Sequence, residues 1–288
     1  MISIIICSRD LHLYNKVLKS IEETIGVVTY EIIKVNNLVE NVPITKAYNI
    51  GIQKSKYEYL LFIHEDVLFH TKNWGEILTN IFANNLKIGL VGIAGAKYKS
   101  KFPSAFWHTK EELLTMNLIQ HQPYKETSHI NRGFKESSLE KVVVIDGVFI
   151  GLRKSTTVKF NEEILGFHCY DLGISIDVFD KQYQIVVTNQ ILIEHFSIGN
   201  TDFNFLKSVI NFHKLYKKQL PKYIERKDSS LENVALKKFL GVCLSNRFIP
   251  FNLWMYNLLK NPFERLNYSI LKLVAYEFKK KIKCLKFP

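Results

Sequence analysis

The sequence contains few cysteines, and none of them forms a recognisable motif. Four cysteines are scattered over 288 residues, and no CxxC spacing occurs. A zinc ribbon needs closely spaced cysteines and a disulfide framework needs numerous ones, so neither is indicated. A reducing compartment fits this cysteine usage best.

Long hydrophobic runs and glycine-rich phosphate loops are also missing. Because no run reaches about 18 uninterrupted apolar residues, no membrane-spanning helix is expected. The N-terminal "MISIIICSRD" lacks the basic start and the length of a signal peptide. Neither GxGxxG nor GxxxxGK[ST] occurs, which removes support for a dinucleotide site or a P-loop. These absences predict a cytoplasmic protein.

Positive charge is unevenly distributed along the chain. The formal net charge is +12, yet residues 203–288 alone hold 18 Lys+Arg against five Asp+Glu. Residues 1–202 are therefore close to neutral, which argues against a protein that coats nucleic acid. Apolar residues make up 47% of the chain, enough for a sizeable core. We expect a neutral domain over residues 1–202 and a basic extension over residues 203–288.

Apolar spacing predicts alternating strands and helices in the first domain. Strands are expected at 2–7, 29–35, 58–63 and 88–95, and helices at 11–25, 44–55 and 73–86. Further strand patterns cover 139–155 and 184–196, with a helix at 171–183 between them. This alternation predicts an α/β fold with a mostly parallel sheet flanked by helices. Residues 97–138 read as a long polar loop with a short helix near 110–117, and residues after 203 read as helical.

In the stretch "YLLFIHEDVLFH" (59–70), an apolar strand is followed directly by His64, Glu65 and Asp66. Adjacent carboxylates repel each other, so they favour either a solvated loop or a bound cation. Ligands of open parallel sheets bind beyond the carboxyl ends of the strands, where these residues are expected. Mg²⁺ and Mn²⁺ prefer oxygen ligands, so a divalent cation is the functional interpretation and a solvated loop the alternative.

Several segments in order resemble the GT-A glycosyltransferases of the large inverting family 2, and most closely a bacterial subgroup similar to StrF proteins. They are "ISIIICSRD", "KAYNIGIQKSKYEYLLFIHEDVLF", "IGLVGIAGAKY", "VVVIDGVFIGLRKS", "GFHCYD" and "ILIEHFSIG". The resemblance covers about residues 1–200. It implies a GT-A fold and the transfer of a sugar from a sugar nucleotide.

The resemblance assigns donor-side roles by position. His64, Glu65 and Asp66 occupy the place of the family's DXD motif, with Asp66 as a metal ligand and His64 where relatives have the first Asp. It also implies donor contacts from Ser8, Arg9, Asn36 and Asn49. Because Asn36 stands where relatives commonly have an Asp, the base of the nucleotide is left open.

The resemblance also implies the catalytic base and a second metal ligand. Asp171 corresponds to the carboxylate that takes a proton from the acceptor hydroxyl, although a helix cap is the alternative. At a helix N-terminus the macrodipole would lower its basicity. His195 corresponds to a histidine that completes the shell of Mn²⁺ or Mg²⁺, with a structural strand-end histidine as the alternative.

Four further residues are candidates for acceptor binding. Asp146 and Gly147 either form a turn or contact the acceptor. His168 either packs beside Phe167 or hydrogen-bonds the acceptor, and Trp107 either anchors the long loop or stacks on an acceptor sugar.

The basic extension mixes lysines with large apolar residues, as in "LKLVAYEFKKKIKCLKF" (271–287). Such segments suit an anionic membrane surface, which would place the protein at the inner face of the cytoplasmic membrane. The alternative is a helical subdomain that packs on the catalytic domain with solvated lysines. A nucleic-acid partner is disfavoured because no recognised binding motif accompanies the charge.

Two hypotheses from different classes follow. The first is an inverting, metal-dependent glycosyltransferase that acts on a cell-surface glycan acceptor, lipid-linked or free. The second is a catalytically silent GT-A-like module that binds nucleotide or carbohydrate or scaffolds partners. His64 and Asn36 in place of acids support the second, and the presence of Asp66, Asp171 and His195 together supports the first.

Overall fold

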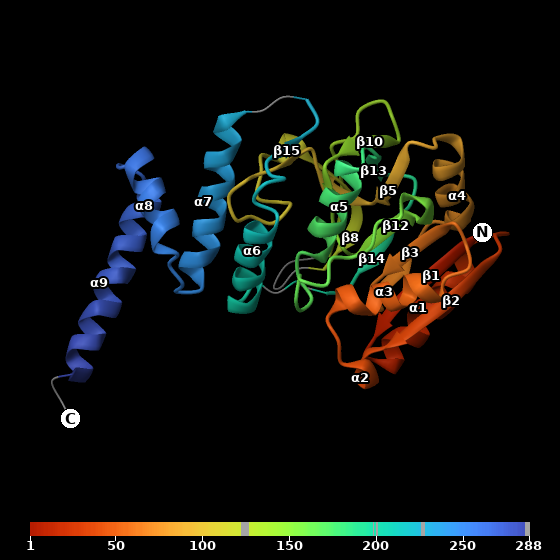
Figure 1. Cartoon of the computed structure of the whole chain (residues 1–288), viewed down its shortest axis with the longest axis horizontal. Helices are drawn as coiled ribbons and strands as arrows, with labels where there is room; N and C mark the ends of the chain where they lie inside the picture. The colour runs from red at the N-terminus through yellow and green to blue at the C-terminus, as the bar shows by residue number, and fades with distance from the viewer. Residues whose placement is uncertain (122–126, 198, 200, 226–227, 286–288) are drawn as a thin grey trace.

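A central seven-stranded sheet organises the computed structural model of the chain (Figure 1). The structure describes residues 1–121, 127–197, 199, 201–225 and 228–285, and side chains up to residue 276. The strand order is β10-β13-β5-β12-β3-β1-β2. The bounds are β1 (Ile2–Ser8), β2 (Tyr30–Asn36), β3 (Tyr59–Ile63), β5 (Ile88–Gly92), β10 (Leu139–Val142), β12 (Phe149–Arg153) and β13 (Gln184–Thr188).

The sheet is mainly parallel, as expected. β1 pairs in parallel with β2 and β3, and β5 pairs in parallel with β13. Only β10 and β12 run against their neighbours. Because β12 is antiparallel to β3, Phe149 at its start lies opposite Ile63 at the end of β3. Asp146 and Gly147 therefore reach the same sheet edge as His64.

Helices cover both faces of this sheet. α1 (Leu11–Thr24) and α4 (Trp74–Asn84) pack on the face that carries Ile4 and Ile6, whereas α3 (Ile44–Lys54) packs on the face that carries Ile5. α5 (Tyr170–Asp180) lies beside α3 in the same second core, and the short α2 (Asn37–Glu40) follows β2. The Asp10 carboxylate accepts the backbone N–H groups of His12 and Leu13 and so fixes the start of α1.

The region 97–138 corrects one expectation, because it holds strands where a long loop was predicted, although a short 3₁₀ helix does lie in the range 110–117 where a short helix was expected. A second sheet has the order β11-β6-β8-β14-β4, and β9 pairs with β8. Its strands are β4 (Val67–Phe69), β6 (Ala94–Ala96), β8 (Leu114–Gln120), β9 (Ser128–Arg132), β11 (Val144–Ile145) and β14 (Ile193–His195). Two strands, β7 (Tyr98–Lys99) and β15 (Lys222–Tyr223), pair separately, and η1 (Glu111–Leu113) and η2 (Lys154–Thr156) are short 3₁₀ helices.

Four helices form the C-terminal part: α6 (Phe203–Leu215), α7 (Ser229–Ser245), α8 (Phe251–Lys260) and α9 (Arg265–Leu285). Figure 1 shows α6 between α5 and α7, and α9 projecting away from the sheet. Leu206 of α6 and Phe239 of α7 belong to the main core, whereas Trp254 of α8 and Ile270 of α9 form a small core with α7. The division between residues 202 and 203 stays a prediction, although α6 packs into the main core of the first domain.

Buried polar groups also join α6 and α7 to β7. The Lys99 ammonium donates to the Ser104 hydroxyl at 2.6 Å and lies 2.8 Å from His213 Nε2 of α6. The Tyr98 hydroxyl donates to the buried Glu232 carboxylate of α7 at 2.7 Å. No helix within the described ranges is both long and apolar enough to cross a bilayer.

Candidate active site

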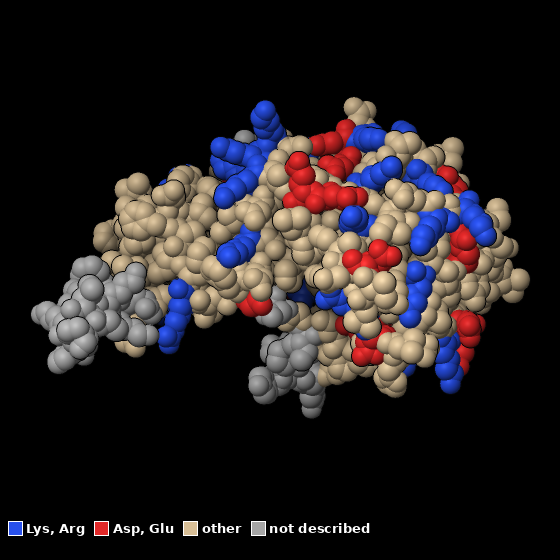
Figure 2. Space-filling model, turned by 60° about the horizontal axis from the view of Figure 1, so that its bottom comes forward, with Lys and Arg blue, Asp and Glu red and all other residues tan. Residues whose placement is uncertain are grey.

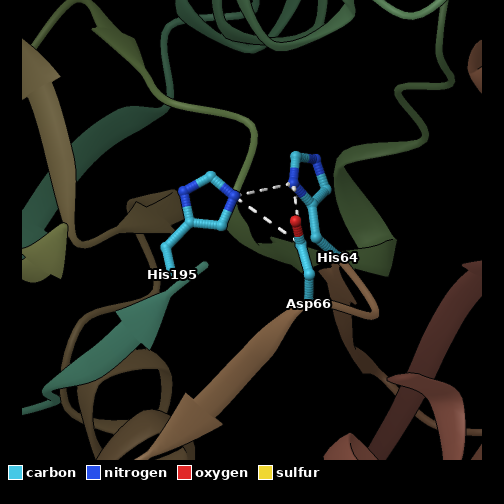
Figure 3. A group of neighbouring side chains, drawn as sticks. All are labelled: His64, Asp66 and His195. Atoms are coloured by element: carbon cyan, nitrogen blue, oxygen red, sulfur yellow. Dashed lines mark hydrogen bonds and ion pairs between the residues drawn. The ribbon is translucent and has the colours of Figure 1, made fainter. Parts of the chain in front are cut away.

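His64, Asp66 and His195 converge at the carboxyl end of β3. His64 and Asp66 follow β3, and His195 ends β14, which pairs with β4 so that His195 lies opposite Val67. His64 Nδ1 is 3.4 Å from His195 Nε2, and Asp66 Oδ1 is 3.8 Å and 3.6 Å from these two nitrogens (Figure 3). These spacings suit an ion at about 2.1 Å from each atom, a distance typical of Mg²⁺ and Mn²⁺. Within the described residues, the only such group of three or more is this one.

A glutamine orients the His195 ring. His195 Nδ1 is 3.1 Å from Gln120 Oε1, and the Gln120 amide nitrogen donates to the carbonyls of His121 and Ser197. Those two bonds fix the amide so that its oxygen must accept from His195 Nδ1–H. Burial, followed by the neighbouring His64, lowers the pKa of His195 to about 4. The ring is therefore neutral near pH 7, with its free Nε2 lone pair directed at Asp66 and His64.

Tyr170 holds the second histidine. Its hydroxyl is 2.6 Å from His64 Nε2, which leaves His64 Nδ1 directed towards His195. Gly147 makes this approach possible, because a Cβ atom at that position would overlap the Tyr170 hydroxyl. Gly147 was predicted from sequence as an acceptor contact, and the structure adds a steric reason for glycine there.

Asp171 lies half-buried beside Asp146 at the N-terminus of α5. Burial and then the nearby Asp146 carboxylate raise the pKa of Asp171 to about 7, against the opposing effect of backbone N–H groups of Leu172, Asp171 and Gly147. The helix N–H groups lower the pKa of Asp171, as expected, but desolvation outweighs them and the net pKa is raised. A carboxylate with this pKa is suited to take up a proton near neutral pH.

Glu65 points away from its two neighbours. Its carboxylate accepts the backbone N–H groups of Arg9 and Asp10 at 3.0 to 3.2 Å, which ties the loop after β3 to the loop after β1. The two adjacent acids thus make different contacts. Asp66 lies beside the two histidines, and Glu65 fixes the backbone of the loop after β1. A donor contact of Glu65 stays a prediction.

Asn49 is likewise engaged within the protein. Its amide donates to the Phe160 carbonyl and the Glu162 carboxylate at 2.8 Å, and its oxygen accepts the Phe160 N–H. The residue is 6% exposed and joins α3 to the loop before α5. The structure therefore gives Asn49 a loop-fixing position, and its donor contact stays a prediction.

The remaining donor-side residues line the carboxyl edge of β1 and β2. Ser8 lies opposite Asn36 in the strand register, with Ser8 buried and Asn36 exposed. The Arg9 guanidinium lies 4.7 Å from the centre of the Phe167 ring and donates to Asn41. The sheet edge thus offers a cation and polar groups beside the metal ligands.

A cavity of about 690 Å³ collects most of the predicted residues. His64, His195, Asp171, Asp146, Gly147, His168 and Trp107 all line it. Trp107 stacks on Phe205 of α6 with ring centres 5.9 Å apart, and His168 meets the same ring edge-on at 5.5 Å. Trp107 is 39% exposed, so this aromatic wall remains accessible. The cavity therefore joins the metal-ligand group, an acidic pair and an aromatic wall.

Sequence reasoning missed Gln120, Tyr170 and Phe205. Tyr170 immediately precedes Asp171, so its position was a usable signal. Gln120 lies in the region predicted as a loop, and Phe205 lies beyond the expected domain boundary. Neither offered a local pattern that pointed to the site.

Comparisons with known proteins agree with this geometry. Residues 3–215 match the model of a family described as "Glycosyltransferase like family". No curated protein matches. A crystal structure of GalNAc-T7 with UDP, GalNAc and Mn²⁺ is similar in fold, with a TM-score of 0.51 and 11% identity; the match covers 92% of this chain and 58% of that one. At that identity the likeness shows the fold alone, which is GT-A. The chain belongs to the glycosyltransferase-like family whose model it matches over most of its length.

Proposed function

We propose that the chain is an inverting, divalent-metal-dependent glycosyltransferase that moves a sugar from a sugar nucleotide to a glycan hydroxyl. The observation that carries the proposal is one cavity lined both by two histidines of the His64, Asp66 and His195 group and by Asp171. The first supplies a metal-binding group and the second a base of raised pKa. GalNAc-T7, the GT-A relative in fold, was crystallised with UDP and Mn²⁺.

The donor would lie along the carboxyl ends of β1, β2 and β3. Ser8, Arg9 and Asn36 border the place of the nucleotide, and Arg9 offers positive charge to phosphate oxygens. His64 Nδ1, Asp66 Oδ1 and His195 Nε2 would hold Mn²⁺ or Mg²⁺. When bound there, the cation supplies charge neutralisation to the departing diphosphate.

Asp171 would act as general base towards the acceptor. Its carboxylate takes the proton of the acceptor hydroxyl while that oxygen forms a bond to the anomeric carbon. The bond from the anomeric carbon to the diphosphate oxygen breaks, and the electron pair leaves with the diphosphate. Attack from the side opposite the leaving group inverts the anomeric configuration. Asp146 raises the proton affinity of Asp171 and borders the acceptor position with Gly147, His168 and Trp107.

We also propose that the acceptor is a cell-surface glycan, lipid-linked, met at the inner face of the cytoplasmic membrane. The support is the arm formed by α8 and α9, where Phe251, Leu259 and Phe263 are 61%, 79% and 100% exposed. In Figure 2 the described part of this arm, next to the grey atoms at the left, is mostly tan and shows no red on the face towards the viewer. Apolar anchors among basic residues suit an anionic lipid surface. We propose in addition that the chain is a member of the StrF-like bacterial subgroup.

A nucleotide panel tests the function. UDP, GDP, ADP, CDP and their hexose conjugates are added to the full chain with and without Mn²⁺, and the melting temperature is measured. A ligand that binds only the folded state raises this temperature by mass action. A Mn²⁺-dependent rise with one nucleotide class is expected, and the configuration of the product at the anomeric carbon then tests inversion by NMR. If no nucleotide gives a metal-linked rise, the silent module described above is favoured instead.

A further inference from the structure

A second cavity of about 450 Å³ adjoins the active-site cavity. It lies between the loop 163–168 and α6, on the side of α5 away from β1 and β2 (Figure 1). Phe167 and His168 line both cavities, so the two share a wall. We call this second cavity the α6 groove. It adjoins the acceptor side of the site through His168, whereas the Arg9 guanidinium meets Phe167, the other shared residue, from the donor side at 4.7 Å.

One face of α6 presents unused polar side chains to the groove. Asn204, Lys207, Ser208 and Asn211 follow one another at helical spacing and all line it. The side chains of Asn204, Ser208 and Asn211 make no hydrogen bond to any described residue, and Lys207 only covers the Phe203 ring at 4.6 Å. Asn204 and Asn211 are exposed and Ser208 is half-buried, so their amides and hydroxyl can give and accept hydrogen bonds to a ligand without first losing an internal partner.

Both walls of the groove are held by contacts elsewhere in the protein. The loop wall is fixed to α3, where Asn49 bonds Phe160 and Glu162, and Thr45 donates to the Ile164 carbonyl at 3.2 Å. The helix wall is fixed because Leu206 and Val209, on the opposite face of α6, are fully buried in the main core. A groove between two fixed walls loses little entropy on binding, as in preformed ligand sites.

The charges of the groove narrow the class of ligand. Lys207 offers one positive charge, whereas Glu163 and Asp202 offer negative charge at the same cavity. This mixture does not favour a polyanion. Phe167, which is 40% exposed, lines the groove, and Trp107 lines the adjoining cavity. Such aromatic surface suits the apolar faces of sugar rings, and the amides of the groove suit their hydroxyls.

We propose that the α6 groove binds the sugar residues of the acceptor that lie beyond the reacting one, so that the acceptor is an uncharged oligosaccharide chain and not a monosaccharide. This inference rests on the proposed function, since it takes the cavity beside Asp171 as the place of the reacting acceptor sugar. Asn204, Ser208 and Asn211 then determine acceptor length. Asn49, through Phe160 and Glu162, is a positioning residue for the loop wall.

The test compares acceptors of different length on the full chain. Neutral mono-, di- and trisaccharides of glucose, galactose and N-acetylglucosamine are assayed for binding by saturation-transfer NMR and for stimulated release of nucleoside diphosphate. Asn211→Trp fills the groove, and Lys214→Trp places the same ring on α6 at an exposed position outside the groove. Ser208→Phe serves as a second filling variant, and a melting curve verifies the folding of each protein.

Oligosaccharides are expected to bind and react better than the matching monosaccharide. Asn211→Trp should reduce that advantage by about tenfold through KM, whereas Lys214→Trp should keep it. The proposed role of the groove would be overturned by any of three results. These are equal use of mono- and oligosaccharides, no binding of any saccharide, and an unchanged length preference in both filling variants. Failure of the proposed function looks different, because then no nucleotide gives a Mn²⁺-linked melting shift whatever saccharide is present.

Discussion

Gly147 lies directly beneath the Tyr170 hydroxyl, so closely that a Cβ atom would overlap that oxygen. Tyr170 in turn bonds His64 at 2.6 Å. We expect Gly147→Ala to displace the phenol and release His64, and so to weaken Mn²⁺-dependent nucleotide binding about tenfold to a hundredfold, as the loss of partners that orient metal ligands does elsewhere. Titration of the nucleotide at fixed Mn²⁺ measures the effect.

Gly241 provides the matched control for this substitution. It lies inside α7, and a Cβ atom there would meet nothing within 4 Å. Gly241→Ala should therefore raise the free energy of unfolding by about 0.5 to 1 kcal/mol and leave nucleotide binding unchanged. If the Gly147→Ala variant and the wild type bind nucleotide equally well at fixed Mn²⁺, the bond from Tyr170 to His64 does not contribute to nucleotide binding.

Gln120 determines which nitrogen of His195 is free. Gln120→Leu removes the acceptor of the Nδ1–H and lets the ring change tautomer or turn. Mn²⁺ affinity, measured by calorimetry or by the melting shift in the presence of nucleotide, should fall about tenfold to a hundredfold. Gln190→Leu is a control, because the Gln190 amide bonds Ser138 away from the cavity. An unchanged Mn²⁺ affinity in Gln120→Leu would contradict the orienting role.

Asp171 predicts both a mutational effect and a pH profile. Asp171→Asn should retain nucleotide binding and lower turnover by about a hundredfold to ten-thousandfold. Because the base acts only when deprotonated and its pKa is raised to about 7, kcat/KM should rise with pH up to about 7 and level off above it. If kcat/KM of the wild type does not change between pH 5 and 8, Asp171 is not the general base.

The strands and helices of the sheet were predictable because their signals are local. Runs such as residues 2–7 and 58–63 are apolar, and Gly26 follows the end of the first helix, so most bounds agree within two or three residues. β8 was missed because its sequence is half polar and one of its partners is distant: Leu118 lies opposite Ile193, far along the chain. A half-polar segment of that kind becomes a strand only when its partners are in place.

Part of the site was also predictable, because some of its residues stand in short local motifs. Asp66, Asp171 and His195 stand in motifs, and the structure brings them to one region. Asn49 and Glu65 stand in the same motifs, yet their side chains bond the protein itself. A motif records that a residue type is needed at a position. It does not distinguish a ligand contact from a bond that fixes the loop beside the ligand.

Lys99 gives a stability prediction. Burial lowers its pKa from 10.5 to about 7, so between these values the unfolded chain binds a proton that the folded chain does not. The free energy of unfolding should therefore rise with pH from about 7 upwards, by at most about 1.4 kcal/mol per pH unit. Lys99→Met should remove this rise, and Lys141→Met, at an exposed position, should keep it. Parallel urea unfolding curves at several pH values measure the slopes.

The exposed apolar residues of the arm predict membrane binding. Leu259→Ser together with Phe263→Ser should reduce co-sedimentation with vesicles that contain anionic lipid. Leu86→Ser is the matched control, since Leu86 is 74% exposed but lies on the catalytic body. Binding should also weaken as salt increases, because surface charges are screened over about 8 to 10 Å near physiological ionic strength. Equal binding to neutral and anionic vesicles would exclude the electrostatic component.

Because Glu65 is engaged with the backbone of the β1 loop, the three side chains that face one another contribute a single negative charge, from Asp66, when both histidines are neutral. A divalent cation held there would keep one uncompensated positive charge. The protein alone would then be a weak chelator, and an anionic diphosphate would complete the electrostatic balance. Metal and donor should accordingly bind as a pair, with each raising the affinity of the other by the same factor.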